Sequence, residues 1–164
     1  MDIFTTPRLR IRQLTPTDGD YWFRINGDPE VMQFIRPVQK REDSDLFLLE
    51  NILNYEIFPA YGRWIVEDRL NAAFIGMLMI RPLQGRPELE LGYALEKGSW
   101  GKGYATELVK GALEYAVHQL KHPGIIALTD PGNKASQQVL LKCGFAYDQD
   151  MFVDGKLARL YKLS

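Results

Sequence analysis

A glycine-rich loop between a strand and a helix carries the clearest chemical signal in the sequence. Gly98, Gly101 and Gly103 fall within six residues, and a helix is expected to begin at Tyr104. Glycine tolerates positive φ angles and lets a ligand approach the backbone closely. The first N–H groups of a helix have no partner inside it and lie at the positive end of the helix dipole. The loop therefore predicts an anion site, best suited to a phosphate.

Two familiar phosphate-binding motifs do not match this loop. A nucleotide P-loop requires Lys and then Ser or Thr directly after its last glycine, whereas Tyr104-Ala105 stands there. A dinucleotide-binding fingerprint requires a third glycine where Thr106 stands. The preceding strand, residues 88–95, alternates acidic and apolar residues, unlike the continuous apolar first strand of that fold. For the loop alone, a tight turn that binds no ligand is the alternative.

The strand that leads into the loop presents a candidate base. Side chains alternate along a strand, so Glu90 shares one face with Glu88, Gly92 and Ala94. A carboxylate that points into a cleft beside this strand could accept a proton during catalysis. The alternative is a strand face whose carboxylates are simply solvated.

A second helix start follows a short apolar strand. Residues 130–133 have the composition of a turn and a cap, with Asn133 as the N-cap residue. Ser136 then falls in the first turn, where it makes local hydrogen bonds or faces a ligand. No metal site is predicted, because the one set of regularly spaced candidate ligands falls at an exposed helix end: Glu114, His118 and His122.

The remaining segments would position these groups. Helical spacing and capping residues predict helices near residues 21–25, after Asp28, over residues 46–55 and 104–120, and after Asn133. Meandering strands first and crossover helices later indicate an α/β fold with a mixed sheet. Alternation and apolar runs predict seven strands, at residues 9–14, 63–67, 73–81, 88–95, 125–129, 145–152 and 156–163.

Length and composition place the chain among ordinary globular proteins. It has 164 residues, of which 46% are hydrophobic and 25% charged, and a formal net charge of -1. One domain over residues 1–164 fits this size. The balanced charge excludes a global positive field for nucleic acid or an acidic membrane. A single cysteine, Cys143, and the lack of a secretory signal or long apolar run lead us to expect a cytoplasmic location.

Taken together, these segments resemble the GNAT superfamily of acyl-CoA-dependent N-acyltransferases. The loop is similar to the pyrophosphate-binding motif of that family, with Gly103 and Ala105 at its small positions and Trp100 in place of the usual Gln or Arg. The resemblance spans nearly the whole chain. Further segments are similar to the branch of the ribosomal-protein N-terminal acetyltransferases RimJ and RimL, namely residues 7–12, 28–32, 133–136 and 142–145.

The resemblance implies a fold and a reaction. The fold would be α/β, with a mixed, mostly antiparallel sheet of about seven strands that is splayed between strands 4 and 5 and flanked by helices. The enzyme would transfer an acetyl group directly from acetyl-CoA, without a metal, to a primary amine. The acceptor would be a protein N-terminal α-amine or a small-molecule amine. A catalytically silent CoA-binding sensor or interaction module is the alternative.

The resemblance also implies roles for individual residues. Glu90 would act as the base, and Ser136 would lie near the thioester. Many family members carry a tyrosine acid four residues after the position of Ser136, but Leu140 stands there, so Ser136 is the substitute that stabilises the departing thiolate or relays a proton to it. The coenzyme would contact Tyr93, Ala94, Leu95, Trp100, Gly101, Lys102, Gly103, Tyr104, Ala105, Thr106, Asn133, Ser136 and Lys142.

Under this resemblance, different residues would contact different parts of the coenzyme. Backbone N–H groups around residues 93–95 would stabilise the oxyanion, and the amides of residues 100–105 would hold the pyrophosphate. Asn133 would bond to the pantetheine arm, and Lys102, Lys134 and Lys142 are candidates for the 3′-phosphate.

Acceptor choice is expected to depend on residues 32–41 and 58–63. Arg36, Lys40, Arg41 and Arg63 fall in these segments, which would suit an acceptor with an acidic group. The sequence does not name the acceptor, and it leaves a homodimer open.

Overall fold

The structure, a computed structural model, describes residues 1–122 and 124–163. Over this part of the chain, eight strands form one sheet in the order β1-β2-β3-β4-β5-β6-β8-β7. Neighbouring strands are antiparallel except β5 and β6, which run parallel. The strands are β1 (Asp2–Thr5), β2 (Leu9–Gln13), β3 (Gly62–Asp68), β4 (Phe74–Pro82), β5 (Leu89–Leu95), β6 (Ile125–Thr129), β7 (Phe145–Val153) and β8 (Lys156–Leu163).

The sheet has one strand more than the sequence predicted. β1 pairs antiparallel with β2, and its register shifts between Asp2 and Phe4. This edge strand has only four residues, and they show no clear alternation of buried and exposed side chains. Its pairing with β2, rather than its own sequence pattern, makes it a strand. The expected number of about seven strands is therefore one too low, whereas the α/β class with a mixed, mostly antiparallel sheet is confirmed.

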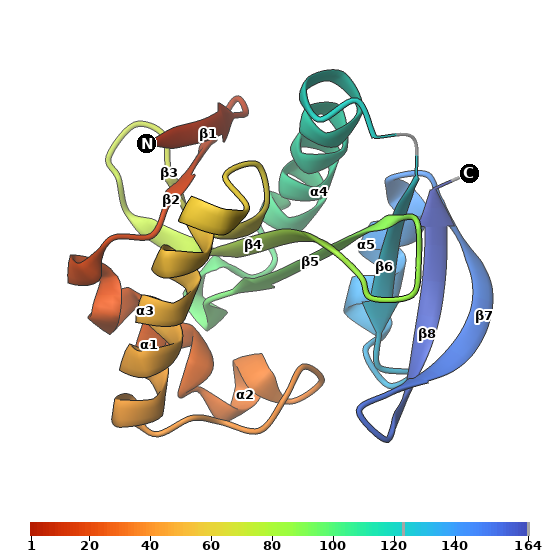
Figure 1. Cartoon of the computed structure of the whole chain (residues 1–164), viewed down its shortest axis with the longest axis horizontal. Helices are drawn as coiled ribbons and strands as arrows, with labels where there is room; N and C mark the ends of the chain where they lie inside the picture. Colours follow the sequence, from red (N-terminus) through yellow and green to blue (C-terminus); the bar gives the residue numbers. More distant parts are fainter. Residues whose placement is uncertain (123, 164) are drawn as a thin grey trace.

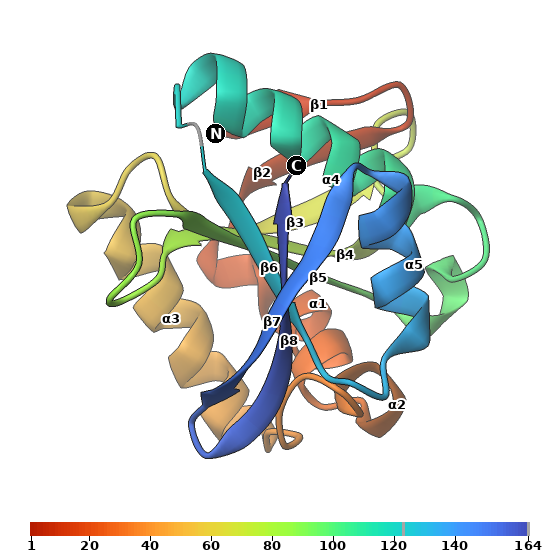
Figure 2. The ribbon, with the colours of Figure 1, turned by 90° about the vertical axis from the view of Figure 1, so that its right-hand side faces the viewer.

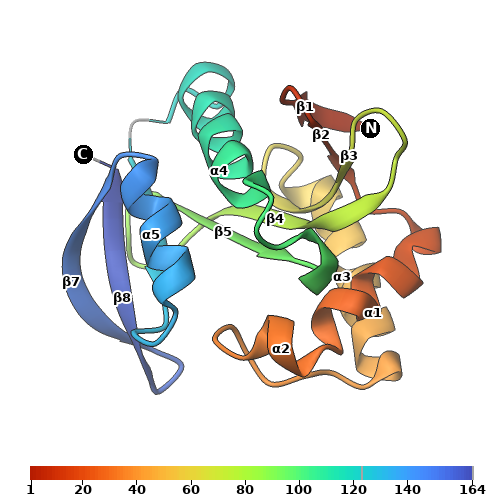
Figure 3. The same ribbon diagram turned by 180° about the vertical axis from the view of Figure 1, so that it is seen from behind.

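Helices cover both faces of the sheet (Figure 1). The first face carries α1 (Gly19–Asn26), α2 (Pro29–Met32) and α3 (Arg41–Ile57). The opposite face, turned to the viewer in Figure 3, carries α4 (Tyr104–Glu114) and α5 (Lys134–Lys142). Each face has its own core, with Trp22 and Ile65 in the first and Leu91 and Leu108 in the second.

The helix predicted over residues 104–120 is α4 followed by a π-helical segment, Tyr115–Gln119. Its apolar stripe is buried as expected at Leu108, Val109 and Ala112. Within residues 1–122 and 124–163, no helix combines the length and the apolarity needed to cross a membrane.

The helix predicted over residues 46–55 is longer than expected and turns its apolar stripe outward. It begins at Arg41 as α3, and Leu46 and Leu53 are 61% and 63% exposed. The side that faces the sheet instead includes the buried Ser44 and Asn51. Helical spacing alone identifies which residues share a side, but it cannot tell which side the sheet covers.

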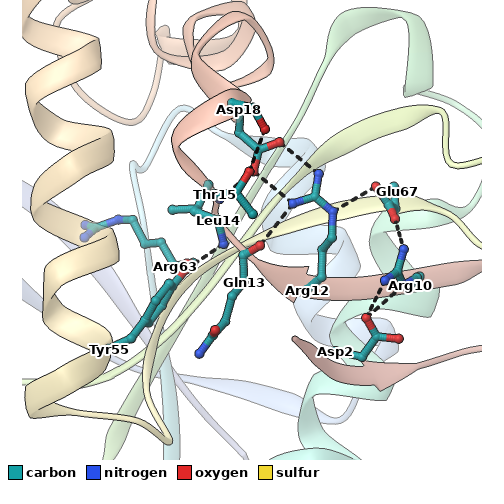
Figure 4. A network of polar contacts seen from close by, with 11 residues as sticks. Asp2, Arg10, Arg12, Gln13, Leu14, Thr15, Asp18, Tyr55, Arg63 and Glu67 are labelled. Atoms are coloured by element: carbon teal, nitrogen blue, oxygen red, sulfur yellow. Dashed lines mark hydrogen bonds and ion pairs between the residues drawn. The ribbon is translucent and has the colours of Figure 1, made fainter.

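Arg12 joins two buried carboxylates at the start of the sheet (Figure 4). Its guanidinium donates to both oxygens of Asp18 at 2.9 Å and to Glu67 Oε2 at 3.1 Å. Arg10 extends this network by donating to Glu67 and to Asp2 on β1. Asp18 and Glu67 are only 3% and 4% exposed, so the network ties the segment between β2 and α1 to β3.

Because of this network, the stability of the fold depends on pH. Burial would raise the pKa of the Asp18 carboxyl, but hydrogen bonds from Arg12 and the Thr15 N–H outweigh burial and hold the pKa below its ordinary value. Such a carboxyl stabilises the fold fully above its unfolded pKa of about 4. The contribution is lost as the pH falls through the lower, folded-state pKa.

Asp18→Asn tests this coupling. We expect the variant to lose about 2 kcal/mol of unfolding free energy at pH 7, because Arg12 loses a charged partner in a buried site. The further loss between pH 5 and pH 2 should be smaller than in the wild type. Urea unfolding across this range measures both effects, with Asp148→Asn on the exposed face of β7 as the control. Equal acid sensitivity in wild type and Asp18→Asn would contradict the prediction.

Candidate active site

The candidate site is built around the open edge between β5 and β6. In the described part of the chain, these strands pair at Leu89 with Ile125 and at Glu90 with Ile126, and at no later position. β5 continues along β4 as far as Leu95, whereas β6 runs on with β8 (Figure 2). The splay therefore lies between β5 and β6, which correspond to strands 4 and 5 of the resemblance.

β5 directs two N–H groups toward this edge. The N–H of Leu89 points to the β6 side, where it donates to the Gly124 carbonyl at 3.0 Å. Backbone groups alternate between the two edges of a strand, and β5 keeps a regular register with β4. Alternation therefore turns the N–H groups of Tyr93 and Leu95 toward the open edge and that of Ala94 toward β4.

The loop between β5 and α4 has the geometry that its glycines predict. Gly101 and Gly103 adopt φ angles of 74° and 79°, in the left-handed region that favours glycine. The first bond of α4 runs from the Glu107 N–H to the Gly103 carbonyl, at 3.2 Å. The N–H groups of residues 104–106 precede this bond and have no acceptor inside the helix. They lie at the positive end of the α4 dipole.

One of the predicted loop amides is already bonded. The Trp100 N–H donates to the Lys97 carbonyl at 3.2 Å, in the short 3-10 turn Lys97–Ser99. The indole N–H donates to the Leu95 carbonyl at 2.9 Å. Trp100 thus ties the loop to the end of β5, and the amides of residues 101–105 are the better candidates for an anion.

Arg8, to which the sequence analysis gave no role in the site, clamps this loop. Its guanidinium donates to the Lys102 carbonyl at 2.9 Å and to the Glu107 carboxylate at 3.0 Å. It also lies 4.4 Å from the centre of the Tyr104 ring. Arg8 and Lys102 are 94 residues apart, so no local pattern could have revealed this contact.

The start of α5 brings a serine and a tyrosine together. Asn133 Oδ1 accepts from the Ser136 N–H at 3.2 Å, which makes Asn133 the N-cap that the sequence predicted. The Ser136 side chain lies close enough to the phenol of Tyr93 to affect its pKa. Burial raises the pKa of this phenol, and the nearby Ser136 hydroxyl only partly offsets the rise. Tyr93 therefore stays protonated at neutral pH, and its side chain joins a site for which the sequence suggested only its backbone.

The other end of α5 lies beside the first turn of α4. Cys143 Sγ donates to the Thr106 carbonyl at 3.7 Å. Lys110 and Lys142 lie close enough to act on this thiol electrostatically, but burial is the larger effect and raises the pKa of Cys143. Lys142 is exposed, and it places a positive charge near Cys143, which contacts the first turn of α4.

Glu90 lies on the opposite face of β5, toward α3. It is 7% exposed, and its Oε2 accepts from Arg81 Nε at 3.0 Å, directly across on β4. The second oxygen, Oε1, has no hydrogen-bond partner in residues 1–122 and 124–163. The predicted base is thus a buried carboxylate with one bonded and one free oxygen.

Thr129 is a site residue that the sequence analysis missed. It is 6% exposed at the end of β6, and its hydroxyl has no partner among the described residues. Alternation places it on the same face as Ile125 and Ala127, which pack in the core under α4 and α5. A buried hydroxyl without a protein partner usually hydrogen-bonds to a ligand or to water. Alternation within the predicted strand could have indicated this face.

Together, these groups suit a long ligand with an anionic end. Free amides and positive charge gather at the start of α4, and polar groups follow along the splay to Thr129 and Asn133. Tyr93 and Ser136 hold protons on one face of β5, and Glu90 offers a carboxylate on the other. No group of three or more His, Cys, Asp or Glu side chains that could hold a metal occurs in the described residues.

Comparison with known proteins identifies the family. YkkB of Bacillus subtilis is 31% identical over 149 residues, which cover 88% of this chain and 85% of that protein. A GNAT-family acetyltransferase from Bacillus anthracis has a TM-score of 0.85 at 23% identity and covers 99% of this chain and 97% of its own. RimL, a ribosomal L7/L12 acetyltransferase solved with coenzyme A, has a TM-score of 0.81 at 14% identity, over 99% and 97% of the two chains.

The match to the family itself spans most of the molecule. Residues 8–146 fit the domain described as Acetyltransferase (GNAT) domain, and they include the splay, the loop and the start of α5. The chain therefore belongs to the GNAT family of acetyltransferases.

Proposed function

We propose that this protein is an N-acetyltransferase that moves the acetyl group of acetyl-CoA directly to a primary amine. The observation that carries the proposal is the open edge between β5 and β6, which ends at a glycine loop followed by N–H groups that have no acceptor inside α4. The structurally similar RimL was solved with coenzyme A, which supports the same ligand here.

The coenzyme would follow the splay on the face of α4 and α5. The pyrophosphate binds the amides of residues 101–105, at the positive end of α4. The pantetheine arm adds to the open edge of β5 as an extra strand would, with Asn133 and Thr129 beside it. Lys142 meets the 3′-phosphate.

The acetyl transfer needs an uncharged amine, an oxyanion site and a way to stabilise the thiolate. The amine nitrogen forms a bond to the thioester carbon, and the carbon–sulfur bond breaks with its electrons on sulfur. The N–H groups of Tyr93 and Leu95 stabilise the oxyanion that forms in between. An α-amine has a pKa near 8, so part of it is uncharged at neutral pH.

Proton handling is divided between the two faces of β5. Glu90 takes the proton of the attacking amine through its free Oε1, directly or through a water molecule. Ser136 donates a hydrogen bond to the departing thiolate, and the protonated Tyr93 phenol positions the Ser136 hydroxyl for this role. This pair replaces the tyrosine that many family members carry where Leu140 stands. Within this function, the acceptor is a protein N-terminal α-amine, as the RimJ/RimL resemblance favours, or a small-molecule amine.

Gly103→Asp tests the coenzyme site. Added bulk and negative charge at the start of α4 should weaken acetyl-CoA binding by about 100-fold or more, because charge and helix dipole then oppose the pyrophosphate. Isothermal titration calorimetry measures the change. Gly85→Asp is a matched control, since Gly85 has a φ angle of 81° and open space around it. Wild-type affinity in Gly103→Asp would refute the role of the loop.

Tyr93→Phe and Ser136→Ala test the thiolate partner. Each should lower kcat about 100-fold with little change in acetyl-CoA affinity, because a donor that acts in the transition state is lost. If Tyr93 acts through Ser136, the double variant should be no slower than the slower single variant. Tyr161→Phe removes another core phenol as a control. Fully multiplicative losses would mean that the two residues act independently.

Glu90→Gln tests the base. The variant should lower kcat about 100-fold and flatten its rise with pH, because amide nitrogen and oxygen cannot take up the amine proton. Acetyl-CoA affinity should change little, since Glu90 faces away from α4 and α5. An unchanged pH profile of kcat would remove Glu90 from this role.

A further inference from the structure

Three arginine side chains, which we name the arginine cluster, gather on the α3 side of the sheet. They are Arg36, between α2 and α3, Arg63 on β3 and Arg81 on β4. Arg63 is two residues from Ile65, and Arg81 is four residues from Met77. Ile65 and Met77 both pack in the core under α1 and α3. Side chains an even number of positions apart share a strand face, so the cluster lies opposite the proposed coenzyme face.

Two of the three guanidiniums have only neutral partners. Arg36 donates to Asn26 Oδ1, and Arg63 donates to Asn51 Oδ1 at a long 3.3 Å. No ion pair of the described residues includes either arginine, whereas Arg12 on β2 has a carboxylate partner at 2.9 Å.

The third member of the cluster, Arg81, has a carboxylate partner. Arg81 pairs with Glu90, so three positive charges face one negative charge. Among the charged groups that act on Arg63, only Glu90 is negative. The cluster therefore carries an excess of positive charge that the described residues do not compensate.

The cluster is held in place although two of its N–H donors are unsatisfied. The Nε–H groups of Arg36 and Arg63 are buried and have no partner in the described residues. Each guanidinium carbon lies 5.0 Å from the centre of the Phe47 ring. The backbone of Arg63 is fixed as well, because the Tyr55 hydroxyl donates to its carbonyl and accepts from the Leu14 N–H (Figure 4).

Holding these charges together is unfavourable without an anion. Burial, with the neighbouring charges of Arg81 and Arg36, lowers the pKa of Arg63 to about 10. Burial also lowers the pKa of Arg36, again with a contribution from Arg81. A bound anion would offset both the repulsion and the unmet hydrogen bonds.

The cluster lies close to the place where transfer would occur. Arg81 and Glu90 form the cross-strand pair at which β5 still touches β6. Gly92 is two residues farther along β5 on the same face, next to Tyr93, and two residues span about 7 Å. That distance is comparable to the length of a small amine with an anionic group at its other end.

We propose that the arginine cluster binds the carboxylate of the acceptor, so that the acceptor is a small amine that also carries a carboxylate. A carboxylate fits because guanidinium groups bind its two oxygens side by side. Arg36 and Arg63 hold the carboxylate, and the free oxygen of Glu90 faces the amine. The inference rests on the proposed N-acetyltransferase function and names its substrate class.

Matched pairs of acceptors test the proposal. Glycine, β-alanine and γ-aminobutyrate are compared with their carboxamides, and putrescine serves as a cationic acceptor. Because amide formation changes the pKa of the amine, kcat/KM is expressed per uncharged amine. Release of the CoA thiol gives the rate. We expect at least one carboxylate to exceed its carboxamide at least tenfold, and putrescine to be a poor acceptor.

Arginine variants connect this preference to the cluster. In Arg36→Gln and Arg63→Gln, the ratio of kcat/KM for the carboxylate to that for its carboxamide should fall at least fivefold. A ratio within one variant does not depend on how much of the protein is folded. Arg10→Gln is the control, because Arg10 lies on β2 and is paired with Asp2 and Glu67, and its ratio should match the wild type.

The outcomes separate the two proposals. Turnover of amines without a carboxylate preference, or a preference that survives in both cluster variants, would overturn this inference and leave the N-acetyltransferase intact. A peptide α-amine preferred over every small carboxylated amine would also overturn it. Loss of acetyl-CoA affinity equal to the loss of acceptor preference would assign the cluster to the coenzyme instead. No acetyl-CoA binding and no transfer to any amine would refute the proposed function itself.

Discussion

The interruption of hydrogen bonding between β5 and β6 is the constraint on which the site depends. After Glu90 and Ile126, the backbone of β5 continues with a partner on one side only. Unpaired backbone groups inside a protein are unfavourable unless something completes them. The opening also connects both sheet faces at one place, so the loop before α4 and the arginine cluster can act on the same small volume from opposite sides.

The sequence revealed the parts of the site that depend on local chemistry. The glycines of the loop, the Asn133 cap and the alternation around Glu90 are each determined by neighbours within a few residues, and all three occur as predicted. Contacts between distant segments were missed. Arg8 reaches Lys102 across 94 residues, and Arg81 meets Glu90 only through strand pairing. The side of α3 that faces the sheet could not be predicted from the sequence either. This side includes polar residues such as Asn51, which bonds to Arg63.

The same chain uses arginine in two contrasting environments. Around Arg12, carboxylates surround the guanidinium, and the result is a network that holds β2, β3 and α1 together. Around Arg63, neutral amides and an aromatic ring take those places, and charge is left over. Folded proteins generally satisfy buried polar groups, and exceptions concentrate where function requires them. Stability and recognition are thus assigned to adjacent strands of one sheet.

The environment of Cys143 has a practical consequence. Disulfide reagents that report free CoA react with thiolate rather than thiol. Cys143 is the one cysteine of the chain, it is half-buried beside α4, and its pKa lies above the ordinary value. The protein's own sulfur is therefore slow to react at neutral pH, and a colorimetric signal in such an assay comes from the coenzyme.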